Sequence, residues 1–141
     1  MSISLRRART IIRKAFEKGR ELELKPLSVA VLDAGGHLIA FEREDGSSPG
    51  RFAIAHGKAY GSVMLGMAGT AQRDRAEQQH YFVSAVNGLF GGQMVPVPGG
   101  LLVRDTKGNV IGAVGVTGDT SENDAAAGLA GIEGVGLTGE A

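Results

Sequence analysis

His56 is the side chain in this sequence with the clearest potential for cofactor chemistry. It is one of three histidines, with His37 and His80, and their spacing does not match the paired ligands of a zinc site. His56 lies in a stretch of small residues that is predicted to be helical, where an imidazole could serve as an axial ligand to haem iron. The alternative is an ordinary histidine that packs against its neighbours or faces solvent.

Two acidic residues, Glu122 and Asp124, lie where a helix is predicted to begin. Their carboxylates could act as acid, base or metal ligand. They could equally do no more than stabilise the helix, because negative charge in the first turn interacts favourably with the helix dipole. Thr120 or Ser121 is expected to cap this helix.

The segment Val103–Ala127 must position these carboxylates. It is typical of a strand, a tight turn, a Gly-rich strand and the start of a capped helix. Gly112, Gly115 and Gly118 are unusual there, because glycine weakens a strand and marks a bend or the close approach of a ligand or another backbone. Two interpretations remain open: Thr117 and Gly118 form the wall of a small-molecule pocket, or the glycines let a helix pack closely on the sheet.

Composition favours one globular domain, residues 1–141. With no cysteine, the chain has no disulfide, thiol catalysis or thiolate metal site. Fifteen basic and fifteen acidic residues give zero formal net charge, which argues against nucleic acid or an anionic membrane as main partner and is compatible with self-association. No apolar run reaches the ~18 residues that span a bilayer, and the N-terminal segment lacks the apolar core of a signal peptide. We therefore expect a cytoplasmic protein.

The hydrophobic pattern predicts an alternation of helices and hairpins. The expected elements are a helix over 5–19 with a basic outer face, strands at 27–33 and 38–42, helices at 52–67 and 71–86, a short edge strand at 94–97, a strand at 110–117 and a final helix at 121–135.

The sequence also repeats itself. Val31–Ala40 aligns without gaps on Val103–Gly112. Either two hairpins share only their turn chemistry, or two equivalent hairpins lie in one antiparallel sheet. The stretch Gly134–Gly139 matches the pattern G-x-G-x-x-G, but it follows a predicted helix and so lacks the strand, turn and helix that dinucleotide binding requires.

Three stretches together resemble one known family. They are VAVLDAGGHLIAF, the AHGKA stretch of the middle helix, and PGGLLVRDTKGNVIGAVGVTGDTSENDAA. They are similar to the GlcG/HbpS-like haem-binding family, which is also found as the C-terminal domain of PduO-type corrinoid adenosyltransferases. The segment Gln78–Pro98 does not follow the commoner pattern of that family.

The resemblance implies a profilin-like α/β (α+β) fold, with a central antiparallel sheet of about five strands and helices packed on its faces. It also implies a homo-oligomer, from a dimer up to an octamer, and haem or a related tetrapyrrole as ligand, with links to redox sensing or haem handling. The pocket is then expected between the Gly-rich strand, the start of the last helix and the middle helix. The expected site residues are His56 as iron ligand, Lys58, Thr117, Gly118, Glu122 and Asp124.

Two other functions remain open. The first is a catabolic accessory enzyme acting on a small oxygenated carboxylate, in which Arg51 and Lys58 hold the anion and Glu122 or Asp124 moves a proton. The second is an oligomeric accessory subunit without a ligand, suggested by zero net charge and by the small residues of the final helix.

Overall fold

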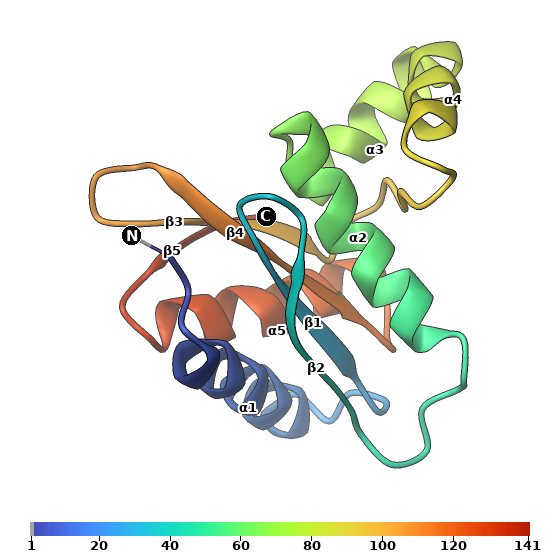
Figure 1. Ribbon diagram of the computed structural model, residues 1–141. Coiled ribbons are helices and arrows are strands. Elements are labelled where there is room, and N and C mark those ends of the chain that lie inside the picture. The colour runs from blue at the N-terminus through green and yellow to red at the C-terminus, as the bar shows by residue number, and fades with distance from the viewer. Residues whose placement is uncertain (1) are drawn as a thin grey trace.

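The computed structural model describes residues 2–141 and contains a five-stranded antiparallel sheet between layers of helices (Figure 1). The strand order is β2-β1-β4-β3-β5. In chain order the elements are α1 (Leu5–Glu21), β1 (Ser28–Asp33), β2 (Leu38–Arg43), α2 (Arg51–Leu65), α3 (Gly69–Gln78), α4 (His80–Leu89), β3 (Gly100–Arg104), β4 (Val110–Thr117), α5 (Ser121–Glu133) and β5 (Thr138–Glu140). The predicted α/β class, with about five antiparallel strands and helices on the faces, is confirmed.

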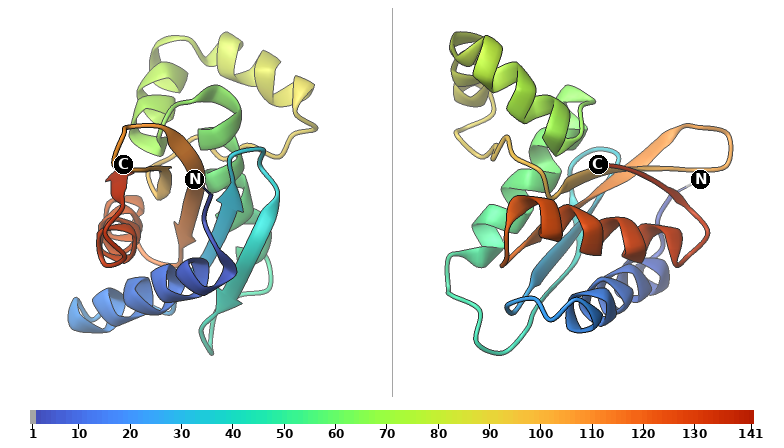
Figure 2. Two further views of the ribbon diagram at one scale, coloured as in Figure 1. Left: turned by 60° about the vertical axis from the view of Figure 1, so that its left-hand side comes forward. Right: turned by 180° about the vertical axis from the view of Figure 1, so that it is seen from behind.

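The two faces of the sheet are packed differently. Helices α1 and α5 cover one face, and α2 covers the other (Figures 1 and 2). The α1/α5 side holds the large apolar core, which includes Ile11, Val31, Leu101 and Ile132. The α2 side has a thin layer of small residues, so that α2 lies very close to the sheet.

Gly115 shows how close this approach is. A Cβ atom built on Gly115 would collide with the carbonyl oxygen of Ala55 on α2. Of the two interpretations of this glycine, close helix-on-sheet packing is therefore the correct one, because the backbone of α2 occupies the space beside it.

The predicted pair of equivalent hairpins is confirmed. Asp33 Oδ1 accepts hydrogen bonds from the backbone N–H groups of Gly35 and His37, each at 2.9 Å. Asp105 Oδ1 does the same for Lys107 and Asn109, also at 2.9 Å. In both hairpins the strand register shifts beside the turn, so the repeat in sequence is a repeat in geometry.

Other predicted elements need correction. The helix predicted over 71–86 is two helices, because Gln79 leaves helical geometry at φ −139° and ψ 62°. The strand predicted at 94–97 is wrong: Pro96 and Pro98 cannot donate to a ladder, and the segment instead hydrogen-bonds to α2 through Val95 N–H and Gly57 C=O at 3.2 Å.

The end of the chain also differs from expectation. Helix α5 ends at Glu133 and not at 135, and a turn through Gly136, at φ +78°, leads into β5. The stretch Gly134–Gly139 thus forms a helix end, a turn and an edge strand that pairs with β3.

Candidate functional site

Lys58 and Asp124 form a buried ion pair where α2, β4 and α5 meet. Lys58 Nζ lies 3.1 Å from Asp124 Oδ2 and also donates to the carbonyl oxygen of Val116 at 2.9 Å. The two residues are only 3% and 1% exposed. Asp124 Oδ1 accepts a further hydrogen bond from the N–H of Asp119 at 2.9 Å, which fixes the carboxylate at the start of α5.

Burial and pairing act on these two groups in opposite directions. Desolvation lowers the pKa of Lys58 and raises the pKa of Asp124, while the attraction between the two charges offsets part of each shift. Because the lysine and the carboxylate are occupied by each other and by backbone groups, neither is open to a ligand. The pair lies where α2, β4 and the start of α5 meet, which is the region in which the sequence predicted a pocket.

Arg51 lies at the mouth of the same region. Its Nη1 donates to Thr117 Oγ1 at 2.8 Å, and its Nε donates to Ser48 Oγ at 3.2 Å. Beside it is a hollow of about 320 Å³, lined by Lys25, Arg51, Gly118, Asp119 and Thr120. The predicted residues Thr117 and Gly118 therefore lie near Lys58 and Asp124, at the end of β4.

Asp119 limits what this small hollow can hold. Its carboxylate accepts hydrogen bonds from the side chain of Asn123 and the N–H groups of Lys25 and Thr120, which together lower its pKa to about 2. A carboxylate that is ionised at every physiological pH opposes the entry of an anionic ligand between Arg51 and Lys25.

Glu122 lies apart from this cluster. Its carboxylate is exposed and forms an ion pair with Arg73 of α3, with Nη1 and Oε1 3.2 Å apart. Glu122 lies in the first turn of α5, where the predicted stabilisation of the helix N-terminus applies, and its ion pair is a surface contact between α3 and α5.

His56 lies on another side of α2, in a row of aromatic rings. Its ring centroid is 5.7 Å from that of Phe52 and 5.6 Å from that of Tyr60, with which it is stacked. Phe41 of β2 contacts Phe52 edge-on at 4.9 Å, and Phe90 contacts Tyr60 in the same way at 6.3 Å. The row therefore joins the sheet, α2 and the end of α4.

A hollow of about 580 Å³ adjoins this row. Its lining residues are Phe52, Ala53, Ile54, His56, Gly92, Gln93 and Val95. The segment at Gln93 and Val95 crosses α2 at Gly57, where an added Cβ would collide with the carbonyl oxygen of Gln93. The absence of a side chain at Gly57 thus lets this segment form the rim of the hollow beside His56.

The partial burial of His56 determines its charge. Desolvation lowers its pKa below the ordinary value of 6.5, so the imidazole is neutral at neutral pH. Within residues 2–141 its ring makes no hydrogen bond, and a neutral imidazole with a free nitrogen is the form that binds a metal ion. No group of three His, Cys, Asp or Glu residues suited to a metal ion occurs in that range, so His56 would be a lone protein ligand.

The structure thus separates the predicted site into three places. Lys58, Asp124, Thr117 and Gly118 come together, Glu122 lies on the surface, and His56 lies in the aromatic hollow. Phe52 and Tyr60 stand four residues on either side of His56, the spacing of neighbours on one helix face, so these two rings are near His56 in the sequence pattern as well. Phe41 and Phe90, which extend the row, come from other elements, and the local pattern does not indicate them.

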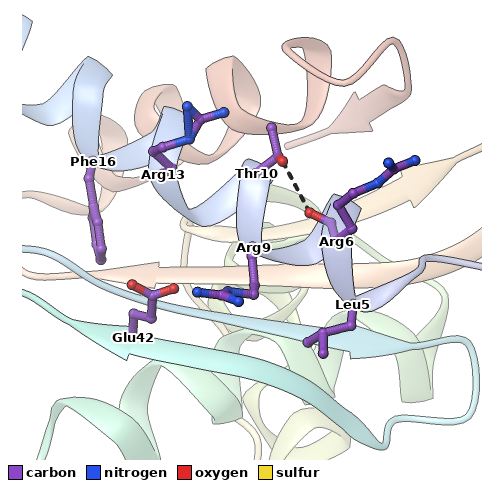
Figure 3. Close-up of a pocket in the computed structure, with 7 residues that line it drawn as sticks. All are labelled: Leu5, Arg6, Arg9, Thr10, Arg13, Phe16 and Glu42. Carbon is purple, nitrogen blue, oxygen red and sulfur yellow. Dashed lines mark hydrogen bonds between the residues drawn. The ribbon is translucent and has the colours of Figure 1, made fainter.

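A groove between α1 and β2 is a further hollow of the structure (Figure 3). It measures about 510 Å³ and is lined by Leu5, Arg6, Arg9, Thr10, Arg13, Phe16 and Glu42. Its arginines belong to the basic face predicted for the first helix. Figure 3 shows Arg9 directed toward Glu42 across the groove. No predicted site residue lines it. Among the described residues, no helix is long and apolar enough to cross a membrane.

Solved structures share this fold. A PduOC complex with heme is 22% identical, covers 97% of both chains and superposes with a TM-score of 0.85. A double mutant of Streptomyces reticuli HbpS is 23% identical, with 96% of this chain and 88% of that chain covered, at a TM-score of 0.82. Klebsiella pneumoniae ORFY is 24% identical, with 93% of this chain and 88% of that chain covered, at a TM-score of 0.80.

Sequence comparison assigns the family. No curated protein sequence matches the chain. The model of the family described as haem-degrading protein, HbpS-like, matches residues 3–133. Because this match extends over nearly the whole sequence, the chain belongs to the HbpS-like family.

Proposed function

We propose that this protein binds haem or a related tetrapyrrole in the aromatic hollow, with His56 as axial ligand to the iron. The observation that carries the proposal is the neutral imidazole of His56, held between Phe52 and Tyr60 beside a hollow of about 580 Å³. Membership of a haem-degrading family and the likeness to a PduOC–heme complex support it.

The residues around His56 fit such a ligand. The hollow has a volume within the range of about 300–1,000 Å³ that ligand pockets occupy. Aromatic faces stack on flat conjugated rings, and Phe52, Ile54 and Val95 give the hollow apolar side chains for such a ring to contact. A bound haem supplies iron redox chemistry, which would underlie a role in redox sensing or haem handling.

Titration with hemin tests this assignment. We expect the purified protein to shift the absorption spectrum of hemin, and the His56→Ala variant to lose the histidine-ligated spectrum and at least tenfold in affinity. His37→Ala is the matched control, because its side chain is 81% exposed beside Asp33 and is not among the residues that line the hollow. A spectrum like that of free hemin, or equal affinity in His56→Ala, would overturn the assignment.

The alternative of an enzyme acting on a small oxygenated carboxylate has weaker support. It requires Lys58 to hold an anion and Asp124 or Glu122 to move a proton, but Lys58 and Asp124 are buried against each other. Of the two residues expected to hold the anion, Arg51 alone lines the 320 Å³ hollow, and the carboxylate of Asp119 opposes an anion there. A panel of 2-hydroxy and 2-oxo acids is expected to give no thermal shift, and a clear shift with any of them would favour this alternative.

The third possibility is an oligomeric accessory subunit without a ligand. Self-association is part of our proposal as well, supported by zero net charge and by exposed apolar side chains. Hemin binding separates the two possibilities, because an accessory subunit of this kind would assemble but leave the hemin spectrum unchanged.

A further inference from the structure

Helix α4 presents apolar side chains to solvent. It has the sequence HYFVSAVNGL, which contains no acidic residue, lysine or arginine, and Val83 is its only buried residue. Tyr81 is 63% exposed and Leu89 is 80% exposed, the highest value among the large apolar residues that are exposed in the described chain. A helix of this composition normally lies in a protein interior.

The position of α4 in the fold explains its exposure. Helices α3 and α4 form an arm that stands away from the two layers covering the sheet (Figures 1 and 2). Within this arm α4 packs mainly on α3. An isolated helix of ten residues is marginal in water, since its stability in proteins comes mostly from packing of its apolar face. The arm therefore lacks a cover on the outer side of α4.

The exposed residues form a stripe along one side of the helix. Tyr81, Ala85 and Leu89 follow each other at intervals of four, which places them on one face. Ser84 and Gly88 border the stripe, and both are exposed. Small residues at the centre and large ones at the ends let another helix approach closely, while Tyr81 and Leu89 pack around the crossing point.

We propose that α4 is the contact surface between two copies of this chain, which cross in antiparallel orientation at Ala85. In a two-fold arrangement Tyr81 of each copy comes opposite the partner's Leu89, and the two α3–α4 arms form a four-helix cluster with the α4 helices inside. This inference rests on the self-association proposed above and assigns it to one surface, the exposed side of α4.

Charge favours a second copy as the occupant. A two-fold contact brings identical surfaces together, so charged residues on the stripe would meet like charges, and Tyr81, Ala85 and Leu89 carry none. The formal net charge of zero leaves no long-range repulsion between copies. A helix about 15 Å long buries less surface than the roughly 800 Å² that each partner contributes to a standard interface. We therefore expect a reversible association, in which the fraction of associated protein increases with protein concentration.

Cysteine cross-linking tests the geometry directly, because the chain has no cysteine of its own. A single cysteine at the symmetric centre, Ala85→Cys, is expected to form a disulfide-linked dimer under mild oxidation. Ala126→Cys on α5 is the matched control: it is also an exposed alanine on a helix, and it reports on an interface through the small residues of α5. Efficient cross-linking of Ala126→Cys without that of Ala85→Cys would overturn the proposal.

Sedimentation of charged variants gives a second measurement. We expect Leu89→Lys to reduce the mass in solution by half or more, because two lysines would lie within one apolar contact. Leu22→Lys, at an apolar residue 42% exposed after α1, should keep the wild-type mass. Circular dichroism of both variants checks that they are folded. A wild-type protein that is monomeric at 100 µM, or an unchanged mass in Leu89→Lys, contradicts the proposal. Hemin titration of the same samples tests the ligand separately.

Discussion

Lys58 of α2 and Asp124 of α5 neutralise each other inside the fold, 3.1 Å apart and almost without solvent contact. Removing one partner leaves an uncompensated buried charge. We expect Lys58→Met to lower the free energy of unfolding by about 3–5 kcal/mol, as measured by urea denaturation. Arg73→Met breaks the exposed pair with Glu122 and should cost about 1 kcal/mol or less.

A double variant separates charge burial from loss of contact. Lys58→Met combined with Asp124→Asn removes both charges but keeps an oxygen that accepts the N–H of Asp119. We therefore expect the double variant to recover most of the stability lost in Lys58→Met. If the double variant is as unstable as the sum of the single ones, the pair is not coupled and the assignment of a buried ion pair fails.

The two hairpin aspartates offer an internal comparison. Asp33 and Asp105 each accept two backbone N–H groups in their turns, and these bonds lower the pKa of both carboxyl groups. We expect Asp33→Ala and Asp105→Ala each to lower the free energy of unfolding by about 1–3 kcal/mol. Replacement by asparagine keeps an acceptor and should restore part of the loss. Thermal denaturation of the four variants checks this, and a neutral effect of either alanine variant would contradict it.

These hairpins are also the part of the fold that the sequence predicted best. Turn chemistry is local, because Asp33 and Asp105 bond to residues two and four positions later. The break at Gln79 and the strand β5 were not predictable in this way. The helical pattern continues across Gln79, and β5 has only three residues, which pair with β3 across more than thirty positions.

The arrangement of the candidate site residues could be predicted only in part, for a related reason. Lys58 and Asp124 were both singled out, but their pairing joins residues 66 positions apart, and a sequence pattern gives no distance between them. His56 was singled out as well. The sequence could have predicted that His56 and Lys58 point to different sides of their helix, because residues two positions apart do not share a helix face.

The close contact between β4 and α2 can be tested by adding one methyl group. Gly115→Ala would place a Cβ against the carbonyl oxygen of Ala55. The nearest atoms all belong to the backbone of α2, so no flexible side chain can move away to make room. We expect a loss of about 1–3 kcal/mol in the free energy of unfolding, or more. Gly50→Ala is the control, because no atom lies within 4 Å of an added Cβ there. Equal stability of both variants would show that α2 lies farther from the sheet.

Asp119 should make stability depend on pH in the acid range. Its pKa is about 2 in the folded protein and 3.8 in the unfolded chain, so the unfolded state binds a proton first as pH falls. The contribution of the ionised Asp119 carboxylate to folding stability is complete above pH 4 and is lost as the pH falls towards 2. We expect the difference in melting temperature between wild type and Asp119→Asn to shrink over that interval. A constant difference from pH 6 to pH 2 would contradict the role of this carboxylate.

The lowered pKa of His56 predicts how hemin binding depends on pH. Desolvation disfavours the imidazolium, so the folded protein holds His56 neutral at pH values where an unfolded chain, with a pKa near 6.5, is already protonated. Protonation therefore competes with iron binding only below pH 6.5, and folding stability decreases over the same range because the unfolded state takes up the proton first.

Two measurements check this expectation. In proton NMR the imidazole signal of His56, assigned by its absence in His56→Gln, should titrate below 6.5. Hemin affinity should stay constant from pH 8 to 6.5 and decrease only below the inflection found by NMR. An inflection at or above 6.5 would show that the ring is open to water, and it would remove the physical basis for His56 as a ligand held ready in its neutral form.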